Sequence, residues 1–100
     1  MKIPNKIKVG GKTYKVEITS KMDLGISNVS AEILYNELII RISKQAEQKM
    51  QADFLHEMFH AIFDHLGYKE HDEKHIDELA QALHMIITDN PQMFKGENCK

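Results

Sequence analysis

The sequence predicts a single α+β domain, in which a small, mostly antiparallel sheet is followed by two long helices. Before Ser43 the apolar residues alternate with polar ones, which is typical of half-buried strands. After Ser43 they recur every three or four residues, which is typical of amphipathic helices. A chain of 100 residues can bury one modest core. We therefore expect one domain over residues 1–92 and a polar tail over residues 93–100.

The first half of the chain predicts the strands. Residues 6–19 alternate in polarity on both sides of a Gly-Gly pair, which indicates a β-hairpin. Residues 21–30 follow neither period and predict a loop, with a short strand fragment at residues 26–29. A second extended region begins near residue 33, and residues 37–42 predict a further strand after a turn.

The second half predicts two helices that are joined by a charged connector. The first helix should end near Gly67, because glycine is favoured at helix C-termini. The second follows the connector at residues 69–73 and ends before Pro91, which cannot continue a helix. The apolar stripes consist of Leu55, Phe59, Ile62 and Leu66 in the first helix and of Ile76, Leu79, Ala80, Leu83 and Ile87 in the second.

Charge and composition exclude several classes of function. The 13 basic and 15 acidic side chains give a net charge of −2, so the chain has no basic field for nucleic acid. It has no apolar run of about eighteen residues, and its first residues lack the apolar stretch of a signal peptide. We expect a cytoplasmic protein without nucleic-acid or membrane partners. Cys99 is the single cysteine, so a metal ion would be held by nitrogen and oxygen atoms.

The first predicted helix carries the motif His56-Glu57-Met58-Phe59-His60. Residues four apart lie on one helical face, so the two imidazoles can bind a single metal ion. Glu57, about 100° around the helix from His56, can contact a water molecule on that metal. The spacing predicts a zinc site (Zn2+) with His56 and His60 as ligands and Glu57 as the catalytic base.

The alternative is a pair of structural histidines that flank a core helix in a chain with 6 histidines. A helical wheel argues against it, because His56 and His60 lie together about 120° from the centre of the apolar stripe. That position faces neither the core nor open solvent, and it suits the edge of a cleft. His65 points about 160° away from the pair, which predicts a surface residue or a loop contact instead of a ligand.

A catalytic zinc ion needs a third protein ligand and one open position, and we expect the second helix to supply the ligand. Asp77 lies about 110° from the centre of the buried face of that helix, and Glu78 lies about 145° from it. Asp77 is therefore favoured over Glu78. Charged residues at a helix start are also common without a metal, because solvent and the helix dipole stabilise them. The candidates on this helix are Glu73, His75, Asp77, Glu78 and His84.

The motif and the second helix together resemble a known group of proteins. The matching segments are His56-Glu57-Met58-Phe59-His60-Ala61-Ile62, Asp77-Glu78-Leu79-Ala80-Gln81-Ala82-Leu83 and Asp89-Asn90-Pro91. They are similar to small zincin-like proteins of phages and Gram-positive bacteria that are related to the ImmA/IrrE metallopeptidases. In that group the third ligand is a glutamate three residues before an alanine, and the matching residue here is Asp77.

The resemblance implies a minimal zincin-like fold and a gluzincin-like peptide hydrolase. Zinc would acidify a water molecule, and Glu57 would accept its proton and later deliver it to the leaving amine. Asp64, one turn after His60, is a candidate to orient an imidazole. The side chains near the connector that offer a further oxyanion donor are His65, Tyr68, His71 and His75.

Two other functions fit the same residues. One is a regulatory or interaction module, encoded by a phage, that keeps the metal site without efficient proteolysis. The other is a purely structural zinc site, which would need a fourth protein ligand and would leave Glu57 without a role. One sheet edge and two helices give few walls for a substrate groove, so a homodimer or a larger complex would have to complete it.

A peptide or protein partner is expected to dock along residues 38–42. This strand directly precedes the metal-binding helix, and as a sheet edge it would pair with an extended peptide by β-augmentation. The alternative is an interior strand whose Leu38, Ile40 and Ile42 belong to the core.

Overall fold

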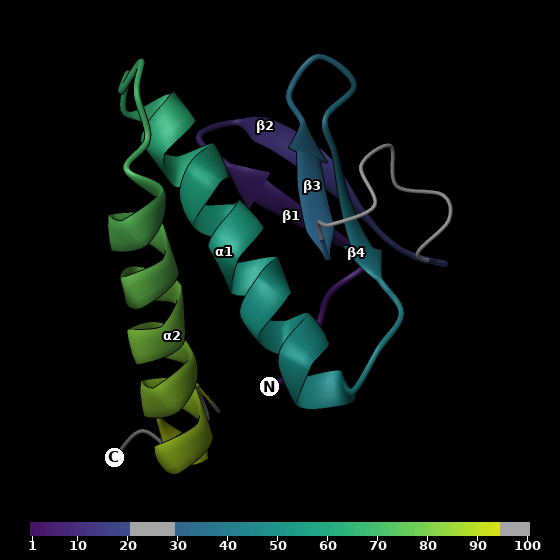
Figure 1. Cartoon of the computed structure of the whole chain (residues 1–100), viewed down its shortest axis with the longest axis vertical. Helices are drawn as coiled ribbons and strands as arrows, with labels where there is room; N and C mark the ends of the chain where they lie inside the picture. Colours follow the sequence, from purple (N-terminus) through teal and green to yellow (C-terminus); the bar gives the residue numbers. More distant parts are fainter. Residues whose placement is uncertain (21–29, 95–100) are drawn as a thin grey trace.

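The computed structural model describes residues 1–20 and 30–94, and it confirms the α+β class (Figure 1). A four-stranded sheet is followed by two long helices and a short 3-10 helix. The strands are β1 (Lys6–Val9), β2 (Lys12–Thr19), β3 (Ala31–Leu34) and β4 (Ile39–Ser43). The helices are α1 (Glu47–His65), α2 (Glu73–Asp89) and η2 (Pro91–Phe94). The strand fragment expected at residues 26–29 lies outside the described residues.

The strands form one sheet in the order β1-β2-β4-β3. β1 and β2 are antiparallel, as are β3 and β4, whereas β2 and β4 pair in parallel from Lys15 opposite Ile39 to Thr19 opposite Ser43. The sheet is therefore mixed, and the expectation of a mostly antiparallel sheet missed its central parallel pairing. Alternating polarity fixes which face of a strand is buried, but it carries no information on which strands are neighbours.

The free edge expected at residues 38–42 is wrong, because β4 pairs with β2 on one side and with β3 on the other. Ile40 and Ile42 are fully buried, as in the alternative of an interior core strand. Along the chain β3 follows β2, but in the sheet β4 lies between them. β3 is therefore on the outer side of β4. Within the described residues β3 has one partner, so β3 is a sheet edge, and it packs against α1 (Figure 1).

α1 lies between the sheet and α2 (Figure 1). The sheet and α2 cover opposite sides of α1, so its buried surface is wider than the single apolar stripe that the sequence predicted. Phe54 is 3% exposed although it lies outside that stripe, whereas Leu66 within the stripe is 62% exposed. A helical wheel with one apolar face could not predict this, because it assumes one covered side. The core cluster consists of Tyr14, Ile40, Ile42, Met50, Phe54, Leu55, Ala61 and Ala80.

The predicted helix ends are confirmed. α1 ends shortly before Gly67, which takes a φ of 91° that glycine adopts without strain. α2 begins after Asp72, whose carboxylate accepts hydrogen bonds from the backbone N–H groups of Lys74 (3.0 Å) and His75 (3.4 Å). This cap fixes Glu73 as the first residue of α2. Neither described long helix has the length and apolar content needed to cross a membrane.

The turn between β1 and β2 requires glycine at its first position. Gly10 has a φ of 58°, and a Cβ atom there would overlap the imidazole ring of His65 at the end of α1. Gly11 also has a positive φ, of 89°, but a Cβ atom there would meet no heavy atom within 4 Å. His65 therefore packs on this turn, which is the loop contact expected from its place on the helical wheel.

Candidate metal centre

The two predicted imidazole ligands lie side by side on α1. His56 and His60 are one helical turn apart, and their ring centroids are separated by 5.1 Å. His60 is buried, with 8% of its surface exposed, and the side chain of His56 is 22% exposed. The two rings thus lie between the core and solvent, as the helical wheel predicted.

The first residue of α2 completes the group. In the Glu73 carboxylate, Oε1 lies 3.0 Å from Nε2 of His56, and Oε2 lies 2.9 Å from Nε2 of His60. Ligand atoms of the three residues all lie within 4.8 Å of one another. Around a tetrahedral zinc ion, ligand atoms at about 2.0–2.1 Å from the metal are roughly 3.3–3.4 Å apart. His56, His60 and Glu73 therefore form a group that could hold a metal ion.

The electrostatic surroundings favour the metal-binding form of the buried imidazole. Burial lowers the pKa of His60 below its usual value, and the positive charges of His56 and His71 act in the same direction, while Glu73 opposes them. A lowered pKa keeps the imidazole neutral near pH 7, and the neutral ring is the form that binds metal ions.

Asp77, the third ligand expected from the sequence, lies on the other side of the His56 ring. Its Oδ1 is 3.5 Å from Nδ1 of His56, and its Oδ2 accepts a hydrogen bond of 2.7 Å from Gln81. Glu73 and Asp77 are one helical turn apart, so α2 presents both carboxylates to the same imidazole. Asp77 lies outside the group formed by His56, His60 and Glu73. Its place is suited to orienting the His56 ring.

Glu57 is buried beside His56, with 7% of its surface exposed. Burial raises the pKa of Glu57 to about 7, against the opposing effect of His56 and with a contribution from the negative charges of Glu73 and Asp53. A carboxyl group with a pKa near neutrality can both accept and release a proton at physiological pH. Burial thus brings the pKa of the residue predicted as the catalytic base close to neutrality.

This raised pKa predicts a pH-dependent difference in stability between the metal-free wild type and Glu57→Gln. The folded protein binds the Glu57 proton more tightly than the unfolded chain does. The stabilisation that comes from this tighter proton binding at Glu57 is therefore complete below about pH 4.5, and it is lost as the pH rises through about 7. Glutamine cannot ionise, so urea denaturation in chelator should find the variant more stable at pH 8, by up to about 3 kcal/mol. At pH 5 the difference in stability between Glu57→Gln and the wild type should be smaller. An equal difference at pH 5 and pH 8 would contradict the raised pKa.

A cavity of about 260 Å³ opens beside the metal-binding group on the His56 side. The edge strand β3 contributes to one wall and α2 to another, while α1 contributes the floor. Asp53 in this floor is held by hydrogen bonds from Gln45 (2.7 Å) and Lys49 (3.0 Å). The lining residues are Ser30, Ala31, Lys49, Asp53, His56, Glu57 and Asp77. The predicted base, Glu57, and two predicted ligands, His56 and Asp77, therefore line the same cavity.

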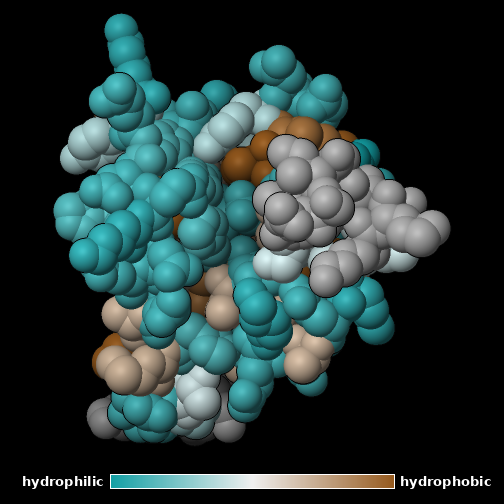
Figure 2. All heavy atoms as spheres, viewed as in Figure 1, coloured by the Kyte–Doolittle hydropathy of each residue, from teal (hydrophilic) through white to brown (hydrophobic). Residues whose placement is uncertain are grey.

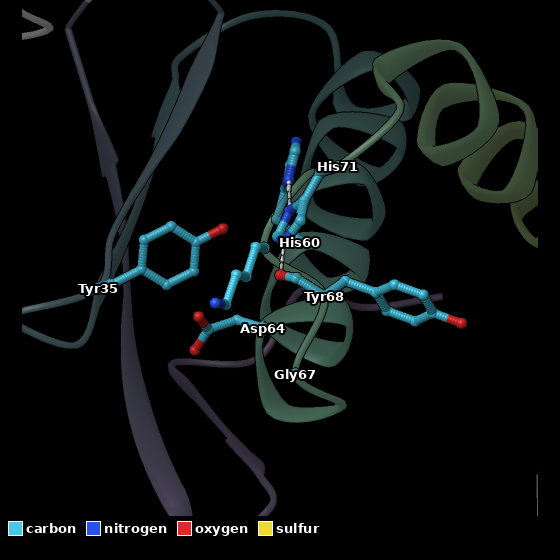
Figure 3. Close-up of a pocket in the computed structure, with 7 residues that line it drawn as sticks. Tyr35, His60, Asp64, Gly67, Tyr68 and His71 are labelled. Atoms are coloured by element: carbon cyan, nitrogen blue, oxygen red, sulfur yellow. Dashed lines mark hydrogen bonds between the residues drawn. The ribbon is translucent and has the colours of Figure 1, made fainter.

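A second cavity, of about 510 Å³, lies on the His60 side (Figure 3). Tyr35, from the turn after β3, points its hydroxyl group across this cavity toward His60 (Figure 3). Burial, together with the charges of Asp64 and Glu57, raises the pKa of Tyr35 to about 12, so the phenol stays protonated and can donate a hydrogen bond. The sequence offered no signal for Tyr35, because no motif links it to α1. The lining residues are Tyr35, His60, Asp64, Gly67, Tyr68, Lys69 and His71.

Two of the side chains considered as oxyanion donors are engaged elsewhere. The ring of Tyr68 packs against Phe63 with a centroid distance of 5.1 Å, and its hydroxyl points away from the cavity in Figure 3. His75 is exposed on α2, where its Nδ1 lies 3.5 Å from Oδ2 of Asp72. Neither side chain faces the metal-binding group.

Two further candidates also have partners away from the metal-binding group. Nε2 of His84 lies 2.9 Å from Oε1 of Gln51, which links α2 to the start of α1. Asp64, considered as the group that orients an imidazole, has its Oδ2 3.9 Å from Nζ of Lys12. The hydrogen-bond partner of Nδ1 of His60 is instead Nδ1 of His71, at a distance of 2.8 Å. The partner of that imidazole is therefore a histidine of the connector.

The surface over the first turns of α2 is polar, and the first exposed hydrophobic residue along this helix is Leu79. Figure 2 shows hydrophilic residues over the upper part of this helix, the part that carries Glu73 and Asp77. The exposed hydrophobic residues near the other end of the helical region are Met85, Ile86, Met93 and Phe94. The end of α2 that contributes Glu73 to the group that could hold a metal ion is thus the charged one.

Searches against protein-family models, curated proteins and solved structures find no match. The resemblance to zincin-like proteins therefore stays an expectation, and a function has to be argued from the geometry of the site.

Proposed function

We propose that the protein is a zinc-dependent peptide hydrolase. The observation that carries the proposal is one carboxylate in contact with two imidazole Nε2 atoms, with the buried Glu57 beside the first imidazole. Catalytic zinc sites use three protein ligands and leave one position open, whereas structural sites use four. The group formed by the described residues has three members, His56, His60 and Glu73.

The motif favours zinc, because two histidines four residues apart on a helix, with a glutamate after the first and a further carboxylate from elsewhere, are a common ligand set of catalytic zinc. When bound, zinc would supply a Lewis acid that polarises a peptide carbonyl and acidifies water. Glu57 would take the proton of the attacking water and deliver it to the leaving amine. The pKa of about 7 suits Glu57 to both steps, because neither proton transfer is then strongly uphill.

We assign the third ligand to Glu73 and give Asp77 the role of a positioning residue. Glu73 contacts the Nε2 atoms of both imidazoles, whereas Asp77 approaches only Nδ1 of His56. An imidazole that binds a metal through Nε2 carries its proton on Nδ1, where a carboxylate can accept the hydrogen bond. This assignment gives a role to the two acidic residues of α2 that approach His56, and it moves the ligand one helical turn before the residue that the sequence favoured.

The proposed substrate is an extended peptide that pairs with β3. Within the described residues β3 is a sheet edge, and its first residue, Ala31, lines the cavity that contains His56 and Glu57. Backbone groups on such an edge bind a main chain without requiring a particular side chain. The proposal thus retains the peptide partner expected from the sequence, but the strand on which this peptide docks is β3 and not β4.

The test is hydrolysis of a mixed peptide library by protein that has been stripped of metal and then reloaded with zinc. Cleavage products are expected with zinc and not without it, because zinc would supply the Lewis acid that polarises the carbonyl and acidifies the attacking water. Zinc binding without any hydrolysis would favour the alternative of a metal-binding interaction module. Absence of zinc binding would exclude both functions.

A further inference from the structure

His71, in the connector between α1 and α2, contacts the His60 ring on the side away from Glu73. Its Nδ1 lies 2.8 Å from Nδ1 of His60, and its Nε2 lies 3.2 Å from the backbone carbonyl oxygen of Tyr68. The two imidazole rings are nearly parallel, with centroids 5.0 Å apart and an interplanar angle of 22°. Figure 3 shows the two hydrogen bonds as a continuous chain from Tyr68 through His71 to His60.

The direction of each hydrogen bond in this chain follows from one fixed acceptor. A carbonyl oxygen can only accept, so Nε2 of His71 carries a hydrogen and donates it to Tyr68. In the neutral ring, Nδ1 of His71 is then an acceptor, and Nδ1 of His60 has to donate to it. When a metal ion binds Nε2 of His60, the neutral ring carries its proton on Nδ1, which is the donor that this chain requires. Without the metal, Nε2 lies 2.9 Å from Oε2 of Glu73, which can only accept, so a metal ion bound by His60 and Glu73 would take the place of the hydrogen between them.

The carbonyl at the start of the chain is itself held in place by the end of α1. The backbone N–H of Tyr68 donates to the carbonyl oxygen of Phe63, at 3.1 Å, so the connector leaves the helix along a fixed path. The Phe63 ring also lies against the His71 ring, with centroids 5.8 Å apart and an interplanar angle of 70°. His71 is therefore held through Nδ1 by His60, through Nε2 by Tyr68 and by the ring of Phe63.

We propose that His71 is a positioning residue that fixes the tautomer and the orientation of His60, so that Nε2 of His60 faces the metal. The proposal rests on the metal site proposed above. His71 is not itself a ligand, because one of its ring nitrogens is bonded to Tyr68 and the other to His60. Partners of this kind hold a ligand ring in place, and their loss weakens metal binding by about 10- to 100-fold.

The decisive variant is His71→Phe, which keeps an aromatic ring beside His60 but removes the acceptor for its Nδ1–H. His75→Phe is the matched control, because His75 is exposed on α2 and contacts only Asp72 among the described residues. Competition with a chromophoric chelator should show zinc affinity weakened by about 10- to 100-fold in His71→Phe and unchanged in His75→Phe. Equal zinc affinities in the wild type and His71→Phe would overturn the role of His71.

A second measurement does not depend on how the variant folds. In nitrogen-15 NMR of the zinc-loaded wild type, we expect His60 to carry its proton on Nδ1 and to exchange it slowly with solvent. His60 bound through Nδ1, or an Nδ1 proton in fast exchange, would overturn the proposal even if His71→Phe proved unstable. Both results presuppose that the wild type binds zinc. A wild type that binds no zinc would overturn the proposed function and this inference together, whereas the failures described above leave the proposed function intact.

Discussion

Glu57→Gln is expected to lose at least about 100-fold of the peptide-hydrolysing activity while it retains its zinc. The amide keeps the size of the side chain and its place beside His56, but it cannot accept a proton from water. Burial has already raised the pKa of Glu57 to about 7, so the wild-type group accepts that proton near physiological pH. The measurement is the turnover of any peptide that the zinc-loaded wild type cleaves, together with the zinc content of the variant.

The matched control for this substitution is Glu47→Gln. Glu47 is an exposed glutamate in the first turn of α1, ten residues before Glu57, and it is expected to be dispensable. Unchanged turnover in Glu57→Gln would exclude the proposed mechanism. Loss of zinc from the variant would instead identify Glu57 as a ligand, in agreement with a structural site.

Glu73→Ala is expected to weaken zinc binding more than any other single change in α2. Its carboxylate contacts both imidazole Nε2 atoms, so its removal deletes one of three ligands. We expect a loss of affinity of more than about 100-fold, beyond the 10- to 100-fold typical of a residue that only orients a ligand. Competitive titration with a chelator measures this effect.

Two other acidic residues of α2 provide the comparison. Asp77→Ala should weaken zinc binding by about 10- to 100-fold, because Asp77 approaches Nδ1 of His56 and would only orient its ring. Glu78→Ala should leave the affinity unchanged, since Glu78 is exposed and outside the metal-binding group. A larger loss for Asp77→Ala than for Glu73→Ala would return the role of third ligand to Asp77.

Periodicity was sufficient to predict the elements and the ends of the helices. The change from alternation to a helical period located α1 and α2, and Gly67 and Pro91 marked where they end. It could not predict the order of the strands, because β2 and β4 are brought together by a crossover that leaves no trace in local sequence. That crossover turned β4 from an expected edge into the interior of the sheet.

In the candidate site, the sequence could predict the part that lies within one helix. The spacing of His56 and His60 on α1 is fixed by helical geometry, and the two rings do lie together. The approach of α2 is a tertiary property. A helical wheel of α2 ranks residues by their angle from the buried face, and this ranking favours Asp77 over Glu78. It cannot predict how far the long side chain of Glu73 reaches from the capped start of the helix.

The contacts of the connector and the β3–β4 turn were beyond sequence reasoning for a similar reason. His71 meets His60 because the chain folds back at the end of α1, and Tyr35 faces His60 across the cavity from the turn after β3. Neither residue belongs to a motif with fixed spacing from His56-Glu57-Met58-Phe59-His60. Only the packing of the sheet and α2 on α1 brings these residues together.

The most direct test of the proposed metal centre is a crystal structure of the zinc-loaded protein with anomalous scattering recorded at the zinc edge. We expect one strong peak per chain, about 2.0–2.2 Å from Nε2 of His56, Nε2 of His60 and a carboxylate oxygen of Glu73, with one further position open to solvent. A peak at any other group of ligands, or no peak in protein saturated with zinc, would contradict the site on which the proposed hydrolase rests.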